Sequence, residues 1–243
     1  MSGGVIKALD AFRARHRAWP LVLLHRAAAY GLRRLVGPRA FTFRGRRLPY
    51  RVHPYILDNE RTVEIPIALD AVARRSADKP RILEVGHVLQ PYAAVPRTIV
   101  DKYEEAPGVL NVDIVDFAPP ERFDLILCLS TLEHVGRDEE PRDPGKALRA
   151  YRHLQTLLAP GGELLVTVPA GYHPELDRAL AGGELGGGDG HHTTALKRHG
   201  RFNRWRECAV TDALARPFGS RYACANGLLV VSWKRTSASP AGG

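Results

Sequence analysis

Short apolar runs alternate with longer segments of helical periodicity from about residue 80 onward. Four such runs have strand length, and each ends at an acid, a glycine or a turn residue: 81–86, 97–101, 123–130 and 162–169. Residues 144–159 instead space their apolar positions as a helix does, and Pro160-Gly161-Gly162 ends that pattern. Strands that alternate with helices are typical of a parallel sheet with crossover helices. The pattern predicts one α/β domain over residues 80–235.

The first 79 residues carry a different pattern and predict a separate N-terminal extension. Periodicity favours a helix over 5–19 and a second helix from Pro20 to Leu35, which Gly37-Pro38 ends. Residues 40–43 and 48–52 predict a hairpin that turns at Gly45, and Asn59 is the expected cap of a helix that runs to Arg75. We expect residues 1–79 to form an accessory layer over the later sheet.

The C-terminal part predicts the last elements of a mixed sheet. Residues 182–190 are too rich in glycine for a helix or strand, so we expect a mobile lid there. A helix over 210–214 and an antiparallel strand over 228–233 follow, and residues 236–243 form a disordered tail.

The charge of the chain is concentrated at its beginning. Residues 1–51 hold twelve Lys or Arg and one acid, whereas the whole chain of 243 residues has a net charge of +9. Such a segment can attract an anionic surface, a phosphorylated substrate or nucleic acid, or it can be a solvated basic face. No apolar run reaches the roughly 18 residues needed to span a bilayer, so we expect a soluble, cytoplasmic protein. Cys128, Cys208 and Cys224 lack metal-binding spacing.

Three strand ends carry residues suited to a nucleoside ligand. Gly86 allows a close approach of the backbone, Asp101 can accept hydrogen bonds from both ribose hydroxyls, and Asp116 beside Phe117 suits an adenine amine and ring. The carboxyl ends of parallel strands meet at one edge of a sheet, which is where such ligands bind. No G-x-G-x-x-G follows the first strand, which disfavours a nicotinamide cofactor.

These residues and two further motifs resemble class I S-adenosylmethionine-dependent methyltransferases. The motifs are Ser130-Thr-Leu-Glu-His-Val135 and Leu157-Leu-Ala-Pro-Gly-Gly162, and the likeness covers about residues 59–235. The resemblance implies a Rossmann-like fold, with a seven-stranded mixed sheet and helices on both faces. Within that family the chain is similar to bacterial sugar- and polysaccharide-modifying O-methyltransferases, through Glu60-Arg-Thr-Val-Glu-Ile-Pro66 and Val100-Asp-Lys-Tyr-Glu104 among others.

The resemblance also implies a set of cofactor-binding residues: Glu64, Glu84, Gly86, His87, Asp101, Lys102, Asp116, Phe117 and Ser130. By this resemblance, Asp101 binds ribose, Asp116 and Phe117 bind adenine, and Gly86 lies at the methionine moiety. The chain departs from the family at Val88 and Gln90, where the first motif usually has glycines. The closest backbone approach is therefore not ensured.

Glu133-His134 follows the fourth predicted strand, where the transferred methyl group would lie. We expect His134 to take the proton of the acceptor hydroxyl and Glu133 to orient it, although a histidine satisfied by backbone is an alternative. His173 follows the next strand and can contact substrate. Ser130-x-x-Glu133-His134 also resembles the magnesium site of quinone-ring O-methyltransferases, so Glu133 and His134, with His173, are candidate Mg²⁺ ligands. His191 and His192 look like a metal pair, and they are also candidates for substrate contact in the lid.

The expected function is O-methylation of a hydroxyl on a sugar, oligosaccharide or glycan precursor, with S-adenosyl-L-methionine as methyl donor. A phenolic or quinone acceptor and an RNA-directed methyltransferase or binding protein remain alternatives. We expect no obligatory nucleic-acid partner, because the basic residues lack the interleaved aromatic pattern of single-strand readers. Peripheral contact of the N-terminus with an anionic surface is a further expectation.

Overall fold

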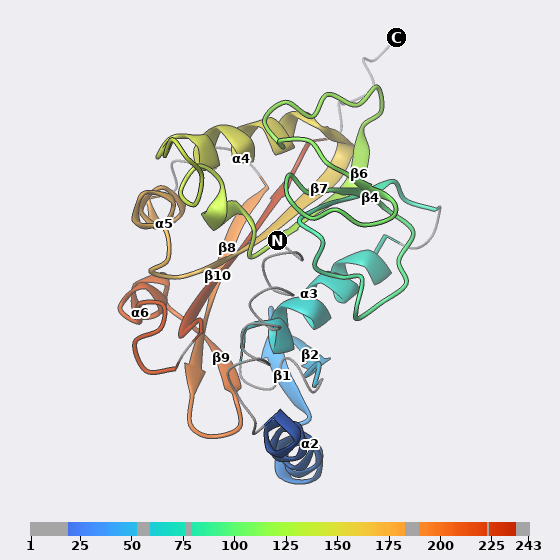
Figure 1. Cartoon of the computed structure of the whole chain (residues 1–243). Coiled ribbons are helices and arrows are strands. Elements are labelled where there is room, and N and C mark those ends of the chain that lie inside the picture. The colour runs from blue at the N-terminus through green and yellow to red at the C-terminus, as the bar shows by residue number, and fades with distance from the viewer. Residues whose placement is uncertain (1–18, 53–58, 76–78, 183–189, 223, 237–243) are drawn as a thin grey trace.

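An eight-stranded sheet forms the centre of the computed structural model (Figure 1). The structure describes residues 19–52, 59–75, 79–182, 190–222 and 224–236, with side chains from residue 27 onward. The strand order is β5-β4-β3-β6-β7-β10-β8-β9. In chain order the strands are β3 (Ile82–Val85), β4 (Thr98–Val100), β5 (Val109–Leu110), β6 (Phe123–Leu129), β7 (Leu158–Pro169), β8 (His191–His199), β9 (Arg204–Cys208) and β10 (Gly227–Lys234).

The first five of these strands run parallel, and the last three are joined by antiparallel pairings. Helices cover both faces: α3 (Arg61–Ala73) lies on one, and α4 (Lys146–Thr156), α5 (Pro174–Ala181) and α6 (Val210–Leu214) lie on the other. The predicted Rossmann-like mixed sheet is confirmed. It has one strand more than the predicted seven, because β9 adds to the edge of β8.

The N-terminal extension follows the predicted pattern where it is described. Helix α2 (Trp19–Val36) precedes a hairpin of β1 (Ala40–Phe43) and β2 (Arg46–Pro49). Arg44 and Gly45 turn the hairpin with φ of 49° and 74°, the left-handed pair that a two-residue turn with the twist of β-strands requires. The apolar face of the hairpin packs with α3 on one face of the main sheet. The predicted second helix and the hairpin turn at Gly45 are confirmed, but the second arm spans 46–49 and not the predicted 48–52.

Helix α3 begins later than predicted. Its N-cap is Glu60, and no side chain caps it, so the predicted cap at Asn59 is wrong. Pro66 lies inside the helix and lacks the N–H that would bind the carbonyl of Thr62. That carbonyl instead accepts the backbone N–H of Arg51 at 2.9 Å. The proline thus leaves an acceptor that joins the extension to the helix.

Two boundaries after residue 157 also differ from the prediction. Strand β7 already begins at Leu158, because Phe123 pairs with Leu158 before a register shift. His191 and His192 begin β8, where they pair with Trp233 and Ser232, so they do not lie in a loop. The predicted helix over 5–19, the centre of the lid at 183–189 and the tail from 237 lie outside the described residues. Among the helices that the structure describes, none has the length and hydropathy needed to cross a membrane.

Candidate functional site

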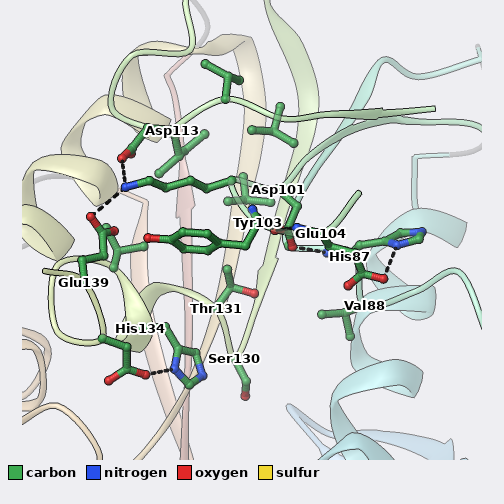
Figure 2. A pocket seen from close by; sticks show the side chains of 18 of the residues that line it. His87, Val88, Asp101, Tyr103, Glu104, Asp113, Ser130, Thr131, His134 and Glu139 are labelled. Atoms are coloured by element: carbon green, nitrogen blue, oxygen red, sulfur yellow. Dashed lines mark hydrogen bonds and ion pairs between the residues drawn. The ribbon is translucent and has the colours of Figure 1, made fainter. Parts of the chain in front are cut away.

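A cavity of about 860 Å³ opens at the carboxyl ends of β3, β4 and β6 (Figure 2). This is the edge that the sequence pattern predicts, and the volume suits a small-molecule site. Six of the predicted site residues line the cavity: Gly86, His87, Asp101, Lys102, Ser130 and His134. The other predicted residues lie behind or beside its wall.

Gly86 follows β3 and brings the backbone to the cavity wall. Its φ is +85°, and a Cβ atom there would lie 2.2 Å from Thr131 Oγ1, so any other residue must displace the neighbouring strand end. Behind this turn the buried carboxylate of Glu84 accepts the backbone N–H groups of Val88 and Leu89 at 2.9 and 2.7 Å. It also pairs with Arg97. Glu84 thus shapes the turn without lining the cavity.

Asp101 lies at the end of β4 and organises the neighbouring turn. Its Oδ1 accepts the backbone N–H groups of Tyr103 and Glu104 at 2.9 and 2.8 Å, and its Oδ2 accepts that of His87 at 3.2 Å. A carboxylate has about four acceptor positions. One position on Oδ2 therefore stays available for a hydroxyl in the cavity.

Asp113 is a cavity residue that sequence reasoning missed. It lines the wall with Ile114, whereas Asp116 is exposed and Phe117 is buried against Phe123, both away from the cavity. The signal was present, since Asp113 is the first acid after the end of β5 and precedes an apolar residue. The distance from the strand end therefore predicts which acid reaches the cavity better than the aromatic neighbour of Asp116 does.

Two lysines hold the acids at this end of the cavity. Lys102 Nζ lies 2.8 Å from both Asp113 Oδ2 and Glu139 Oε2, and Lys146 pairs with the same two carboxylates. Desolvation acts to raise the pKa of Asp113 and of Glu139, but the two ammonium groups prevail and lower it. Both acids therefore stay ionised at neutral pH.

Glu64 lies beneath the cavity floor and positions two residues that reach it. Its buried carboxylate accepts the hydroxyls of Ser130 and Thr167 at 2.5 Å each, and Arg61 Nη1 at 2.8 Å. Arg61 and Ser130 line the cavity, but Glu64 does not. Arg61 was not predicted as a site residue, although it lies within the quoted segment 60–66. Its planar guanidinium matches a ligand carboxylate.

His134 ends the 3₁₀ helix η2 (Leu132–His134) after β6 and is paired with Asp138. The Nδ1 to Oδ2 distance is 2.6 Å, and the hydroxyl of Tyr172 donates to the same oxygen at 2.7 Å. Desolvation acts to raise the pKa of Asp138, but the hydrogen bonds from His134 and Tyr172 lower it overall. Because an ionised carboxylate only accepts, Nδ1 of His134 carries the proton and Nε2 is the basic nitrogen.

Glu133 and His173 occupy different environments from His134. Glu133 is 1% exposed, and burial raises the pKa of its carboxyl well above the usual value. Its Oε1 is 3.7 Å from His134 Nε2, beyond hydrogen-bond distance. His173 is also 1% exposed, and its Nδ1 accepts the N–H of Leu176 at the start of α5. Burial lowers the pKa of this imidazole.

The described residues contain no group of three His, Cys, Asp or Glu side chains placed to hold a metal ion. Glu133 Oε1 lies 3.7 Å from His134 Nε2, but neither Glu133 nor His173 lines the cavity, so the three predicted ligands do not meet there. His191 and His192 are adjacent on β8, and neighbouring residues of a strand point to opposite faces.

The cavity is acidic although the chain is basic. Five lining side chains are carboxylates, and two are permanent cations, Arg61 and Lys102; the acids are Asp101, Glu104, Asp113, Asp138 and Glu139. The whole chain has a net charge of +9. A cavity with this excess of carboxylates favours a ligand with positive charge.

Comparison with known proteins finds only distant likenesses. No family model matches the chain, and no curated protein matches it. The N-methyltransferase NodS of Bradyrhizobium japonicum, in complex with S-adenosyl-L-homocysteine, is 15% identical, with a TM-score of 0.36 over 74% of this chain and 94% of that chain. An S-adenosylmethionine-dependent methyltransferase from Clostridium acetobutylicum is 11% identical, with a TM-score of 0.36 over 70% and 89%.

A third similar structure is the [4+2]-cyclase SpnF, 16% identical with a TM-score of 0.43 over 74% of this chain and 83% of that chain. Likenesses at these identities and TM-scores do not assign an activity to this chain. Its chemistry has to be argued from the cavity.

Proposed function

We propose that the protein is an S-adenosylmethionine-dependent O-methyltransferase. One observation carries the proposal: a glycine with positive φ, an aspartate with an open acceptor position and a histidine paired with Asp138 through Nδ1 line the same acidic cavity. The bound cofactor would supply an electrophilic methyl group on a sulfonium centre, and the excess of carboxylates in the cavity suits that positive charge.

Four residues would hold the cofactor. The open acceptor position of Asp101 suits a ribose hydroxyl, and Asp113 beside Ile114 suits an amine and the face of an adenine ring. Arg61 would pair with the methionine carboxylate, because its position is set by Glu64 at 2.8 Å. Gly86 would bring its backbone to the methionine moiety, because its positive φ and missing Cβ let the chain turn closely beside Thr131.

His134 would accept the proton of the acceptor hydroxyl through Nε2. The ionised Asp138 stabilises the imidazolium that then forms and keeps the ring oriented. Burial and the hydrogen bond to Asp138 raise the pKa of Tyr172 to about 12, so this phenol stays a donor. A hydroxyl of a sugar, oligosaccharide or glycan precursor is the acceptor class we propose.

A phenolic acceptor is the second candidate, and an aromatic pair beside His134 favours it. The ring of Tyr172 packs edge-on against the rings of His134 and Phe218, with centroid distances of 4.9 and 5.2 Å. Phe218 is 36% exposed. Aromatic rings arranged in this way can pack against a planar acceptor or the apolar face of a sugar.

The deciding experiment is transfer of a radiolabelled methyl group to a panel of mono- and oligosaccharides and simple phenols, with and without magnesium and chelator. Calorimetry with S-adenosyl-L-homocysteine should show binding by the wild-type chain and weaker binding by Asp101→Ala. Asp116→Ala is the matched control, because Asp116 is exposed outside the cavity. Absence of binding by the wild-type chain, or equal loss in both variants, contradicts the cofactor site. Retained label transfer in chelator contradicts a metal requirement.

A further inference from the structure

Helix α2 exposes apolar side chains and buries an arginine, the reverse of the usual arrangement of a surface helix. Leu32, Leu35 and Val36 are 53%, 79% and 54% exposed. With the exposed Ala28 they recur at intervals of three and four residues, so they share one face of the helix. We call these four residues the apolar stripe. Figure 1 shows α2 at the edge of the molecule beside β1 and β2.

The side of α2 next to the apolar stripe is attached to the protein through Arg33. This residue is 5% exposed, its Nη1 donates to the carbonyl of Pro38 at 3.0 Å, and its guanidinium lies 5.1 Å from the centre of the Tyr50 ring. These contacts fix how the helix is rotated about its axis. The apolar stripe therefore faces solvent because the arginine side is the one that docks.

The surroundings of the stripe are cationic. Residues 11–57 contain no Asp or Glu, and Arg34, Arg39 and Arg47 are exposed. A second copy of the chain docked through the same face would bring these like charges together, which is unfavourable. An anionic partner is favoured instead.

The composition of α2 favours a lipid surface over an acidic protein. The helix has no Ser, Thr, Asn, Gln, Asp or Glu, and between residues 27 and 36 its only polar side chains are Tyr30, Arg33 and Arg34. A protein interface commonly uses about one hydrogen bond per 100–200 Å², and this face has few groups to supply them. A bilayer interface requires only inserted apolar side chains and cations near the lipid phosphates.

We propose that α2 binds an anionic lipid surface, with Leu32, Leu35 and Val36 inserted among the headgroups and the neighbouring arginines at the phosphates. This goes beyond methyl transfer and does not depend on it. The Tyr50 ring, which Arg33 of α2 contacts, begins a series of hydrogen bonds to the cavity rim. The Tyr50 hydroxyl accepts Trp205 N at 2.7 Å, Trp205 Nε1 donates to Asn203, and Asn203 donates to the carbonyl of Asn59, which lines the cavity. A membrane-bound α2 would thus hold the cavity in a set orientation.

The test is co-sedimentation of the full-length protein with vesicles of phosphatidylcholine alone or of an equimolar mixture with phosphatidylglycerol. We expect wild type to pellet with the mixed vesicles only, and the double variant Leu32→Ser, Leu35→Ser to lose about tenfold or more in partition coefficient. Leu110→Ser is the matched control, because this leucine is 47% exposed on β5, away from the stripe, and it should pellet as wild type does. Circular dichroism checks that the variants are folded.

Several outcomes would overturn the proposal. The first is equal pelleting of wild type and the double variant. If the partner is nucleic acid, the chain would bind RNA with an affinity that the leucine substitutions leave unchanged, while failing to bind vesicles. If the first eighteen residues cover the stripe, the double variant would unfold at a lower temperature and vesicle binding would not change.

Discussion

Asp138 determines which nitrogen of His134 is basic. Its Oδ2 lies 2.6 Å from His134 Nδ1 and, as an ionised carboxylate, accepts the hydrogen bond; Asp138 is four residues further along the chain. The buried Glu133, which is adjacent in sequence, does not form this bond, since its Oε1 lies 3.7 Å from His134 Nε2. The chemistry assigned to His134 therefore depends on a carboxylate in the following turn.

Replacement of Asp138 by Asn should lower kcat by about 10² to 10⁴ while affinity for S-adenosyl-L-homocysteine changes little. An amide can donate to Nδ1, which would favour the wrong tautomer with the proton on Nε2. The measurement is steady-state kinetics with the acceptor found in the transfer assay, together with calorimetry. Asp143→Asn is the control, since this acid is half-buried, lies outside the cavity and pairs with Arg149. Equal kcat in the two variants would remove Asp138 from the mechanism.

Gly86 and Gly45 provide a matched pair for the role of the cavity turn. Both have positive φ, but a Cβ at Gly86 would meet Thr131 at 2.2 Å and a Cβ at Gly45 would meet nothing within 4 Å. Each Ala substitution should cost about 1 kcal/mol of unfolding free energy from backbone strain, with more at Gly86. Only Gly86→Ala should weaken S-adenosyl-L-homocysteine binding, by about tenfold or more. Unchanged binding by this variant would show that the ligand does not approach Gly86.

At the scale of elements, the hairpin of β1 and β2 is fastened to the last strands by long-range hydrogen bonds. Arg44 donates to the hydroxyls of Thr194 and Ser232 at 2.8 Å each, which lie on β8 and β10. Tyr50 accepts the backbone N–H of Trp205 on β9 and donates to its carbonyl. The extension is thus part of the domain's hydrogen-bond network.

Removal of the Tyr50 hydroxyl should test that attachment. Tyr50→Phe leaves a buried backbone N–H and carbonyl without this partner, so we expect a loss of about 1–3 kcal/mol of unfolding free energy in urea denaturation. The control is Tyr222→Phe, whose hydroxyl donates to Gly200 O at an exposed site and whose loss should cost less than about 1 kcal/mol. Similar losses of unfolding free energy in the two variants would mean that the Tyr50 hydroxyl contributes little to the attachment of the hairpin.

At the scale of the whole molecule, buried acids link stability to pH. Burial raises the pKa of Asp177 to about 6, although the N–H of Gly171 and nearby Arg137 act to lower it. The folded state then holds this proton more tightly than the unfolded state. The contribution of Asp177 to the unfolding free energy therefore falls as pH rises from about 4 to about 6. Above that range this contribution no longer changes with pH.

Asp177→Asn should remove this pH-dependent contribution to the unfolding free energy. It amounts to about 3 kcal/mol for a shift of roughly two pKa units. The variant should gain stability relative to wild type at pH 7.5 compared with pH 4, measured by urea denaturation at both values. The amide oxygen can still accept the Gly171 N–H, which Asp177 accepts at 2.7 Å. The same difference between the two proteins at both pH values would place the pKa of Asp177 near its unfolded value.

The strand and helix pattern of residues 80–235 was readable because burial is periodic along the chain. Each central strand is apolar on both faces, and helix α4 has one apolar side. The second helix, the hairpin turn at Gly45 and the last strand were predictable for the same local reason. Strand β9 was not, because its burial depends on Tyr50, 155 residues away.

The sequence by itself determined the α/β class, the edge of the sheet where the cavity lies, and the excess of positive charge at the N-terminus, since these follow from local periodicity and composition. Tertiary structure alone decided that Asp113 lines the cavity while Asp116 does not, that Asp138 pairs with His134, and that α2 turns Leu32 and Leu35 outward. Each of these three features depends on contacts between segments that are distant in the sequence. The spacing of residues along the chain does not specify those contacts directly.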